Sequence, residues 1–156
     1  MKTIKLLIIL ILLSFCLNGE AVPKERVLKN ALFAFNNSMN KQGLPLIPFA
    51  EQAGMLKKYG FDGIEHRETA NIMELKEALD KEGLKIYADY VKIDIDQEQP
   101  YLKEWKEVIP KLKGTGIILW CHLHSEKFKP SDEAADALIV PVMQELADFA
   151  MPYGVR

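Results

Sequence analysis

A unit of helix, glycine and short apolar strand recurs along this chain, and it constrains the fold more than any other feature. The glycines that close the helical segments stand at positions 60, 83, 114 and 154, at spacings of 23, 31 and 40 residues. Each spacing suits one β/α unit. No hairpin signal such as Asn-Gly separates the apolar runs, so successive strands run parallel and are joined by right-handed crossovers. The sequence therefore predicts an α/β fold with a parallel sheet.

The apolar pattern predicts four strands and four helices. The strands are expected at 32–35, 63–64, 84–88 and 116–121. The helices are expected around the apolar faces that begin at Phe49, Ile72, Trp105 and Leu138. Gly60 and Gly83 suit the positions just past a helix end, and Asn71 with Glu74 predicts a capping box. Pro141 predicts a kink, or a helix that begins near it.

The first 21 residues predict a removable export signal. A short positive start, Met1–Lys5, precedes the apolar run Leu6–Phe15, which is shorter than the roughly 20 residues that span a bilayer. Gly19 and Ala21 offer a cleavage site. The alternatives are a buried N-terminal helix and a lipoprotein signal with Cys16 acylated. The expected organisation is a signal peptide at 1–21, a lead-in at 22–31 and one domain at 32–156, exported to the periplasm.

The length remaining after cleavage limits the fold further. A chain of 135 residues (156 − 21) supports one core and falls short of the roughly 200 residues of a complete eight-stranded barrel. The segment 146–156 resembles a helix exit followed by the first residues of a fifth strand. We therefore expect the N-terminal half of a TIM barrel, about four strands and four helices, cut off by truncation. The net charge of −2 and the absence of a basic tract disfavour nucleic acid as a partner.

Polar residues gather where the predicted strands end. In parallel α/β proteins, ligands bind beyond the carboxyl ends of the strands. The residues expected to contact substrate are Glu65, His66, Asp89, Tyr90, Trp120, His122 and His124. Each also has a structural interpretation, such as a solvated loop, a strand-end turn or a structural hydrogen bond. No nucleotide-binding or serine-elbow motif is present, and Cys121 is interpreted as a buried small hydrophobe.

Three segments resemble one known family. The segment 52–65 resembles the entry to the second strand of the sugar phosphate isomerases/epimerases, which belong to the xylose isomerase-like TIM-barrel superfamily. The segment 79–87 resembles the entry to their third strand, and 146–155 resembles the helix that leads into their fifth. The resemblance covers about residues 30–156.

The resemblance implies a function. In that family a divalent metal, held by side chains of strands five to eight, assists a proton or hydride shift between adjacent sugar carbons. Those strands have no counterpart here, so the chain is not expected to ligate the metal fully, and the metal's identity is unknown. The early strands line the substrate pocket, and Glu65 matches the motif glutamate. The other six candidates match by position alone. A related branch, the apurinic endonucleases, uses early histidines as zinc ligands, but the acidic charge and export signal disfavour DNA.

We expect the N-terminal fragment of an exported isomerase or epimerase that acts on a sugar or polyol. By itself the chain is expected to be inactive, with open sheet edges that favour self-association. Two alternatives stay open: a complete small flavodoxin-like domain that binds a ligand without catalysis, and a half-barrel that dimerises to close a ring.

Overall fold

The computed structural model describes residues 30–36, 39 and 45–156. The helices and strands described here all lie in the unit Ala31–Arg156. The predicted signal peptide, Cys16 and most of the predicted lead-in lie outside the described residues. Within the described part of the chain, no helix is long and apolar enough to cross a membrane.

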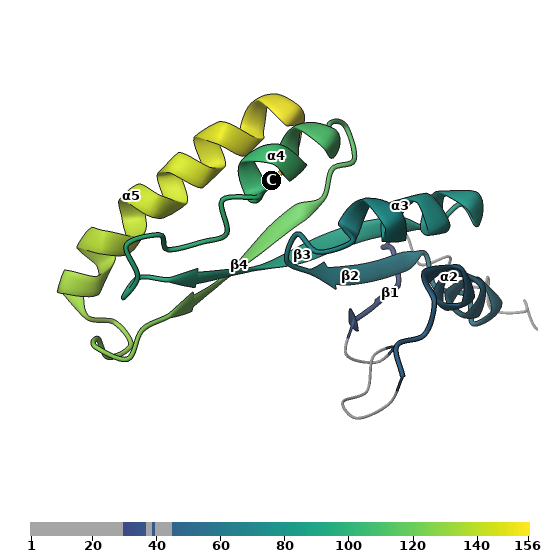
Figure 1. The fold of residues 1–156 in the computed structure, drawn as a ribbon, viewed down its shortest axis with the longest axis horizontal. Coiled ribbons are helices and arrows are strands. Elements are labelled where there is room, and N and C mark those ends of the chain that lie inside the picture. Colours follow the sequence, from purple (N-terminus) through teal and green to yellow (C-terminus); the bar gives the residue numbers. More distant parts are fainter. Residues whose placement is uncertain (1–29, 37–38, 40–44) are drawn as a thin grey trace, which may run out of the picture. The chain divides into compact units, whose positions relative to one another are not determined.

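Strands and helices alternate along this unit (Figure 1). In chain order the elements are β1 (Phe33–Ala34), α2 (Phe49–Lys58), β2 (Gly63–Arg67), α3 (Ile72–Lys81), β3 (Lys85–Asp94), α4 (Trp105–Lys111), β4 (Ile118–His124), α5 (Glu133–Ala150) and the short 3₁₀ helix η2 (Met151–Tyr153). The predicted α/β alternation is therefore confirmed. The largest boundary differences are in β3, which continues to Asp94, and in α5, which begins at Glu133.

The four described strands form one parallel sheet in the order β1-β2-β3-β4. Because crossovers are right-handed, an order without reversal places the connecting helices on the same face of the sheet. Figure 1 shows α3, α4 and α5 together over one face. A flavodoxin-like sheet has the order 2-1-3-4-5, and its reversal puts helices on both faces. The observed order is instead that of consecutive β/α units in a barrel.

A continuous apolar core joins the helices to one face of the sheet. It includes Ile64 and Val91 from the strands, Leu75 and Leu79 from α3, and Trp105 from α4, all of which are fully buried. Burial of each aliphatic side chain of this kind contributes roughly 1.5–3 kcal/mol. The helical spacing that predicted α3 thus marks the face through which α3 contacts the core.

Helix ends agree only in part with the sequence. Gly60 and Gly83 have φ of 78° and 70°, so both occupy the left-handed position expected just past a helix end. The predicted capping box is wrong, because Asn71 has φ of 58° and its side chain makes no cap hydrogen bond. A helix that begins near Pro141 is also wrong. Asp132 caps α5 nine residues earlier by accepting a hydrogen bond from the backbone of the first turn.

One extra residue in β3 determines which of its side chains face the helices. Ile64 of β2 pairs with Ile86, but the next β2 residue pairs with Ala88, so Tyr87 is the extra residue of a β-bulge. Because side chains alternate along a strand, an extra residue reverses the alternation beyond it. Core side chains accordingly occur at Ile86 before the bulge and at Val91 after it.

The β2–β3 pair begins at an unusually close approach of two backbones. A Cβ atom added at Gly63 would lie 1.9 Å from the carbonyl oxygen of Lys85, the residue with which Gly63 pairs. A clash with a backbone atom of a paired strand cannot be relieved by rotating a side chain. Glycine is therefore required at this position by space, and not by its backbone torsion angles.

The last described residues lie beside β4. Val155 is buried, the Arg156 N–H donates to the Ile117 carbonyl oxygen over 3.0 Å, and the Leu119 N–H donates to the Arg156 carbonyl oxygen. One residue that donates to position i and accepts from position i+2 of its neighbour is the hydrogen-bond pattern of parallel strands. The prediction that a further strand begins at this point agrees with these two bonds.

Candidate functional site

The face of the sheet opposite the helices carries polar and aromatic side chains, and we call it the open face. Its residues follow from the register, because directly paired residues in a sheet lie on the same side. From β2 to β4 the rows are Glu65–Ala88–Ile118, Arg67–Tyr90–Trp120, Lys92–His122 and Asp94–His124. The open face thus contains five of the seven residues predicted to contact substrate.

A hollow of about 360 Å³ in the open face is lined by Phe35, Glu65, Arg67, Tyr90 and Trp120. Glu65 is its most buried member, only 4% exposed. Its Oε2 accepts a hydrogen bond of 2.9 Å from the backbone N–H of Asn36, which fixes the carboxylate relative to the end of β1. A buried carboxylate held in this way is pre-oriented to accept hydrogen bonds from a ligand in the hollow.

Stacked planar groups form the wall of the hollow. The guanidinium carbon of Arg67 lies 4.7 Å from the centre of the Tyr90 ring, and the Tyr90 ring stacks on His122 at 5.1 Å between ring centres. The rings of Phe35 and Trp120 make a second contact at 6.1 Å. Trp120 is nevertheless 52% exposed, so much of its indole is available to a ligand. Such contacts hold the rings in place while part of their surface stays uncovered.

A smaller polar group lies where β3 and β4 end. His124 Nδ1 and Lys92 Nζ each lie 3.4 Å from Oδ2 of Asp94. The contact between His124 and Asp94 is within ion-pair distance but is not a hydrogen bond, and the buried Nδ1 of His124 makes no hydrogen bond with any described residue. The expectation that His122 and His124 share one face agrees with the register, in which they pair with Lys92 and Asp94.

His66 and Asp89 lie on the other side of the sheet, toward the helices. They pair in the register, their relative exposures are 4% and 0%, and His66 Nδ1 lies 2.9 Å from Asp89 Oδ2. Burial raises the pKa of Asp89 from 3.8 to about 6, against the opposing effect of the hydrogen bond with His66. Asp89 Oδ1 has no hydrogen-bond partner among the described residues. The structure therefore separates these two residues from the other five predicted contacts.

The bulge in β3 determines which of its strand-end residues face the helices. If β3 kept all its residues but paired with β2 without a bulge, regular alternation from Ile86 would turn Asp89 to the open side and Tyr90 toward the helices. The sequence does carry the signal, because apolar residues shift from an even position, Ile86, to the odd positions Val91 and Ile93. Such a change of parity within one strand indicates a bulge.

Two residues of the hollow, Phe35 and Arg67, are not among the contacts predicted from the sequence. Phe35 continues the alternation of β1, and Arg67 follows Glu65 at a spacing of two. The period of two along each strand is the sequence signal that indicates both.

Glu68, which follows Arg67, connects the end of β2 to β3 and α4. Its carboxylate accepts hydrogen bonds from the Lys92 backbone at 2.7 Å and from the Trp105 indole at 3.3 Å.

The described residues neither form a metal-binding cluster nor present a reactive thiol. Within them, no group of three histidine, cysteine, aspartate or glutamate side chains is placed to hold a metal ion. The divalent metal implied by the family resemblance therefore finds no donor set in this part of the chain. Burial raises the pKa of the Cys121 thiol, which keeps it protonated and weakly nucleophilic.

Comparison with known proteins leaves the family resemblance as a prediction. No protein-family model matches this chain, and no curated protein matches it at a significant level. The resemblance to sugar phosphate isomerases/epimerases thus depends on short sequence motifs, whereas the unreversed sheet order and the two faces of the sheet are features of the structure itself.

Proposed function

We propose that the open face binds a sugar or polyol, and that the chain contributes the first β/α units of an exported isomerase- or epimerase-like protein. One observation carries the proposal: a half-exposed indole, Trp120, and a buried, fixed carboxylate, Glu65, line the same hollow. Sugars present C–H groups on the faces of the ring and hydroxyl groups around its edge. An aromatic plane packs against the former, and a carboxylate accepts hydrogen bonds from the latter.

The neighbouring side chains support the same class of ligand. Arg67 donates hydrogen bonds, and His122 both donates and accepts when neutral. The hollow and its rim can therefore bond sugar hydroxyl groups both as donors and as acceptors. We assign binding, and not proton or hydride transfer, to these residues. The transfer that the family resemblance implies depends on a divalent metal, for which the described residues hold no donor set.

Tryptophan fluorescence tests the proposal directly. The chain has two tryptophans, and Trp105 is fully buried while Trp120 is half-exposed, so a change caused by a ligand on the open face comes from Trp120. We expect a saturable change with at least one member of a panel of aldoses, ketoses and polyols. Calorimetry should show that Trp120→Ala weakens binding about tenfold, whereas Trp120→Phe keeps most of it.

The matched control is Tyr59→Ala, which removes an exposed aromatic residue at the end of α2, outside the hollow. It should leave the affinity unchanged. The proposal fails if no sugar in the panel gives a saturable signal at concentrations well above the roughly millimolar Kd of a weak ligand. It also fails if Trp120→Ala and Tyr59→Ala weaken binding equally.

A further inference from the structure

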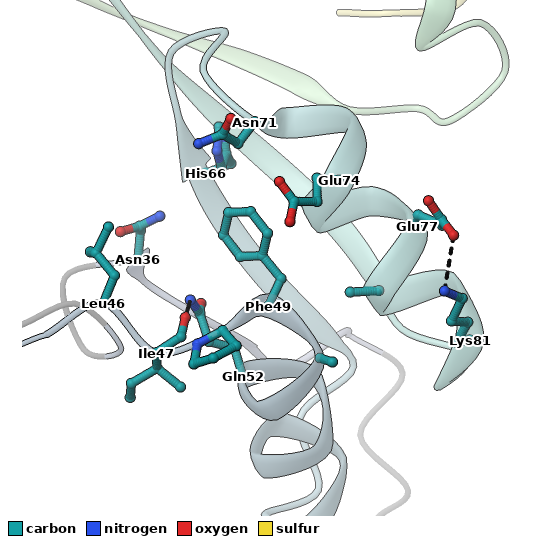
Figure 2. A pocket seen from close by; sticks show the side chains of 13 residues that line it. Asn36, Leu46, Ile47, Phe49, Gln52, His66, Asn71, Glu74, Glu77 and Lys81 are labelled. Atoms are coloured by element: carbon teal, nitrogen blue, oxygen red, sulfur yellow. Dashed lines mark hydrogen bonds and ion pairs between the residues drawn. The ribbon is translucent and has the colours of Figure 1, made fainter.

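A second cavity lies on the helix side of the sheet, between α2 and α3. It has a volume of about 550 Å³, and we call it the α2–α3 pocket. Figure 2 shows His66 and Asn71 at one end, Phe49 in the middle, and Glu74 and Glu77 along α3. None of these residues belongs to the hollow proposed to bind sugar. The pocket therefore lies outside the site proposed above.

His66 gives this pocket a buried hydrogen-bond acceptor. With Asp89 ionised, its carboxylate only accepts hydrogen bonds, so the Nδ1–H of His66 donates to it over 2.9 Å. In the neutral imidazole Nε2 then has a lone pair, and the bond through Nδ1 is the one side-chain hydrogen bond that His66 makes within the described residues. Since the His66 side chain is 5% exposed and lines the pocket, this acceptor is available only to a molecule inside it.

The remaining polar groups make the pocket negative and rich in acceptors. Glu77 is paired with Lys81 at 2.9 Å, which leaves the carboxylate of Glu74 as the charge without a counterion among the described residues. The amide nitrogen of Gln52 is already engaged, because it donates to the Ile47 carbonyl oxygen over 2.6 Å. An anion would meet an uncompensated carboxylate here, and a neutral ligand with few donors would leave the acceptors unpaired.

We propose that the α2–α3 pocket binds a small organic cation of the alkylammonium type. Its N–H groups would donate to Nε2 of His66 and to the carboxylate of Glu74, and its alkyl part would lie against the half-buried ring of Phe49. An ammonium group has three donors and no acceptor, which complements these acceptors. The face of an aromatic ring also attracts a cation, so Phe49 favours the same ligand class.

The test uses n-butylammonium as the probe and n-butanol as its neutral analogue, at constant ionic strength. In nitrogen–proton NMR spectra of the purified chain, n-butylammonium should shift the imidazole Nε2 of His66 and the amides of Phe49 and Asn71 in a saturable way. The indole signal of Trp120 on the open face should not move. n-Butanol should give weaker and unsaturated shifts, because it carries no charge.

Two variants that change the net charge equally identify the responsible carboxylate. Glu74→Gln should weaken n-butylammonium binding roughly fivefold, as expected for the loss of one partly exposed ion pair. Glu82→Gln, at the exposed end of α3 and outside the pocket, should change it by less than about twofold. Equal binding of n-butanol, equal loss in both variants, or shifts centred away from His66 would each overturn the proposal.

Discussion

Replacement of Asp89 by asparagine should remove a pH dependence from the stability of the fold. Asp89 is fully buried, its Oδ1 has no hydrogen-bond partner among the described residues, and burial raises its pKa from 3.8 to about 6. A raised pKa means that the folded protein prefers the protonated carboxyl group. The contribution of this group to stability is therefore complete below pH 3.8 and is lost as the pH rises through about 6.

The magnitude follows from the two pKa values. The change from 3.8 to about 6 corresponds to about 3 kcal/mol at 1.36 kcal/mol per pKa unit. About 2 kcal/mol of this loss falls between about pH 4.5 and about pH 7.5, because the unfolded chain is already partly ionised at the lower pH. The asparagine side chain of the variant stays neutral throughout this range. The free energy of unfolding of wild type relative to Asp89→Asn should therefore fall by that amount.

Urea unfolding followed by circular dichroism at several pH values measures this difference. Because the two sequences differ at this residue alone, subtraction isolates the pH dependence that Asp89 contributes, both directly and through its contact with His66. Asp148→Asn, which changes an exposed aspartate of α5, is the control, and its difference from wild type should vary by less than about 0.5 kcal/mol. A difference between wild type and Asp89→Asn that stays constant with pH would refute the reasoning.

Four further substitutions test the packing of the sheet and helices in the same unfolding assay. Gly63→Ala should cost more than about 3 kcal/mol or prevent folding, because its Cβ would lie 1.9 Å from a carbonyl oxygen of β3, and intact stability would contradict the close approach. Gly54→Ala, with open space around its Cβ in α2, should instead stabilise by up to about 1 kcal/mol. Leu79→Ala should cost about 2–5 kcal/mol, since this side chain is fully buried, and a smaller loss would mean that the core around α3 collapses to fill the space. Glu68→Ala should cost about 1–3 kcal/mol through two lost hydrogen bonds, whereas an unchanged midpoint would show that water replaces them.

Most of the fold follows from local sequence patterns. The apolar spacing of α3 and the glycines at 60 and 83 depend on residues within one or two helical turns, so a single sequence is enough to detect them. Asn71 shows the limit of such local rules. Its side chain has the chemistry of a helix cap, but its backbone adopts a left-handed conformation, in which the cap geometry is lost.

The candidate site was harder to predict, because it depends on how strands pair. Glu65, Tyr90, Trp120 and His122 share the open face only because the bulge reverses the alternation within β3. The same reversal places Asp89 beside His66 on the helix side. Strand ends are visible in a sequence, whereas the partner of each residue is decided by contacts between segments more than twenty residues apart.

The extra residue at Tyr87 also affects how this chain is compared with others. In a related strand without that residue, every later core or ligand-facing side chain would stand one position earlier in the sequence. Aligning such a strand without a gap would match core positions such as Val91 with ligand-facing positions. A gap placed at residues 87–88 aligns core positions with core positions again. Similarity between two such strands would therefore be detected only in an alignment that includes this gap.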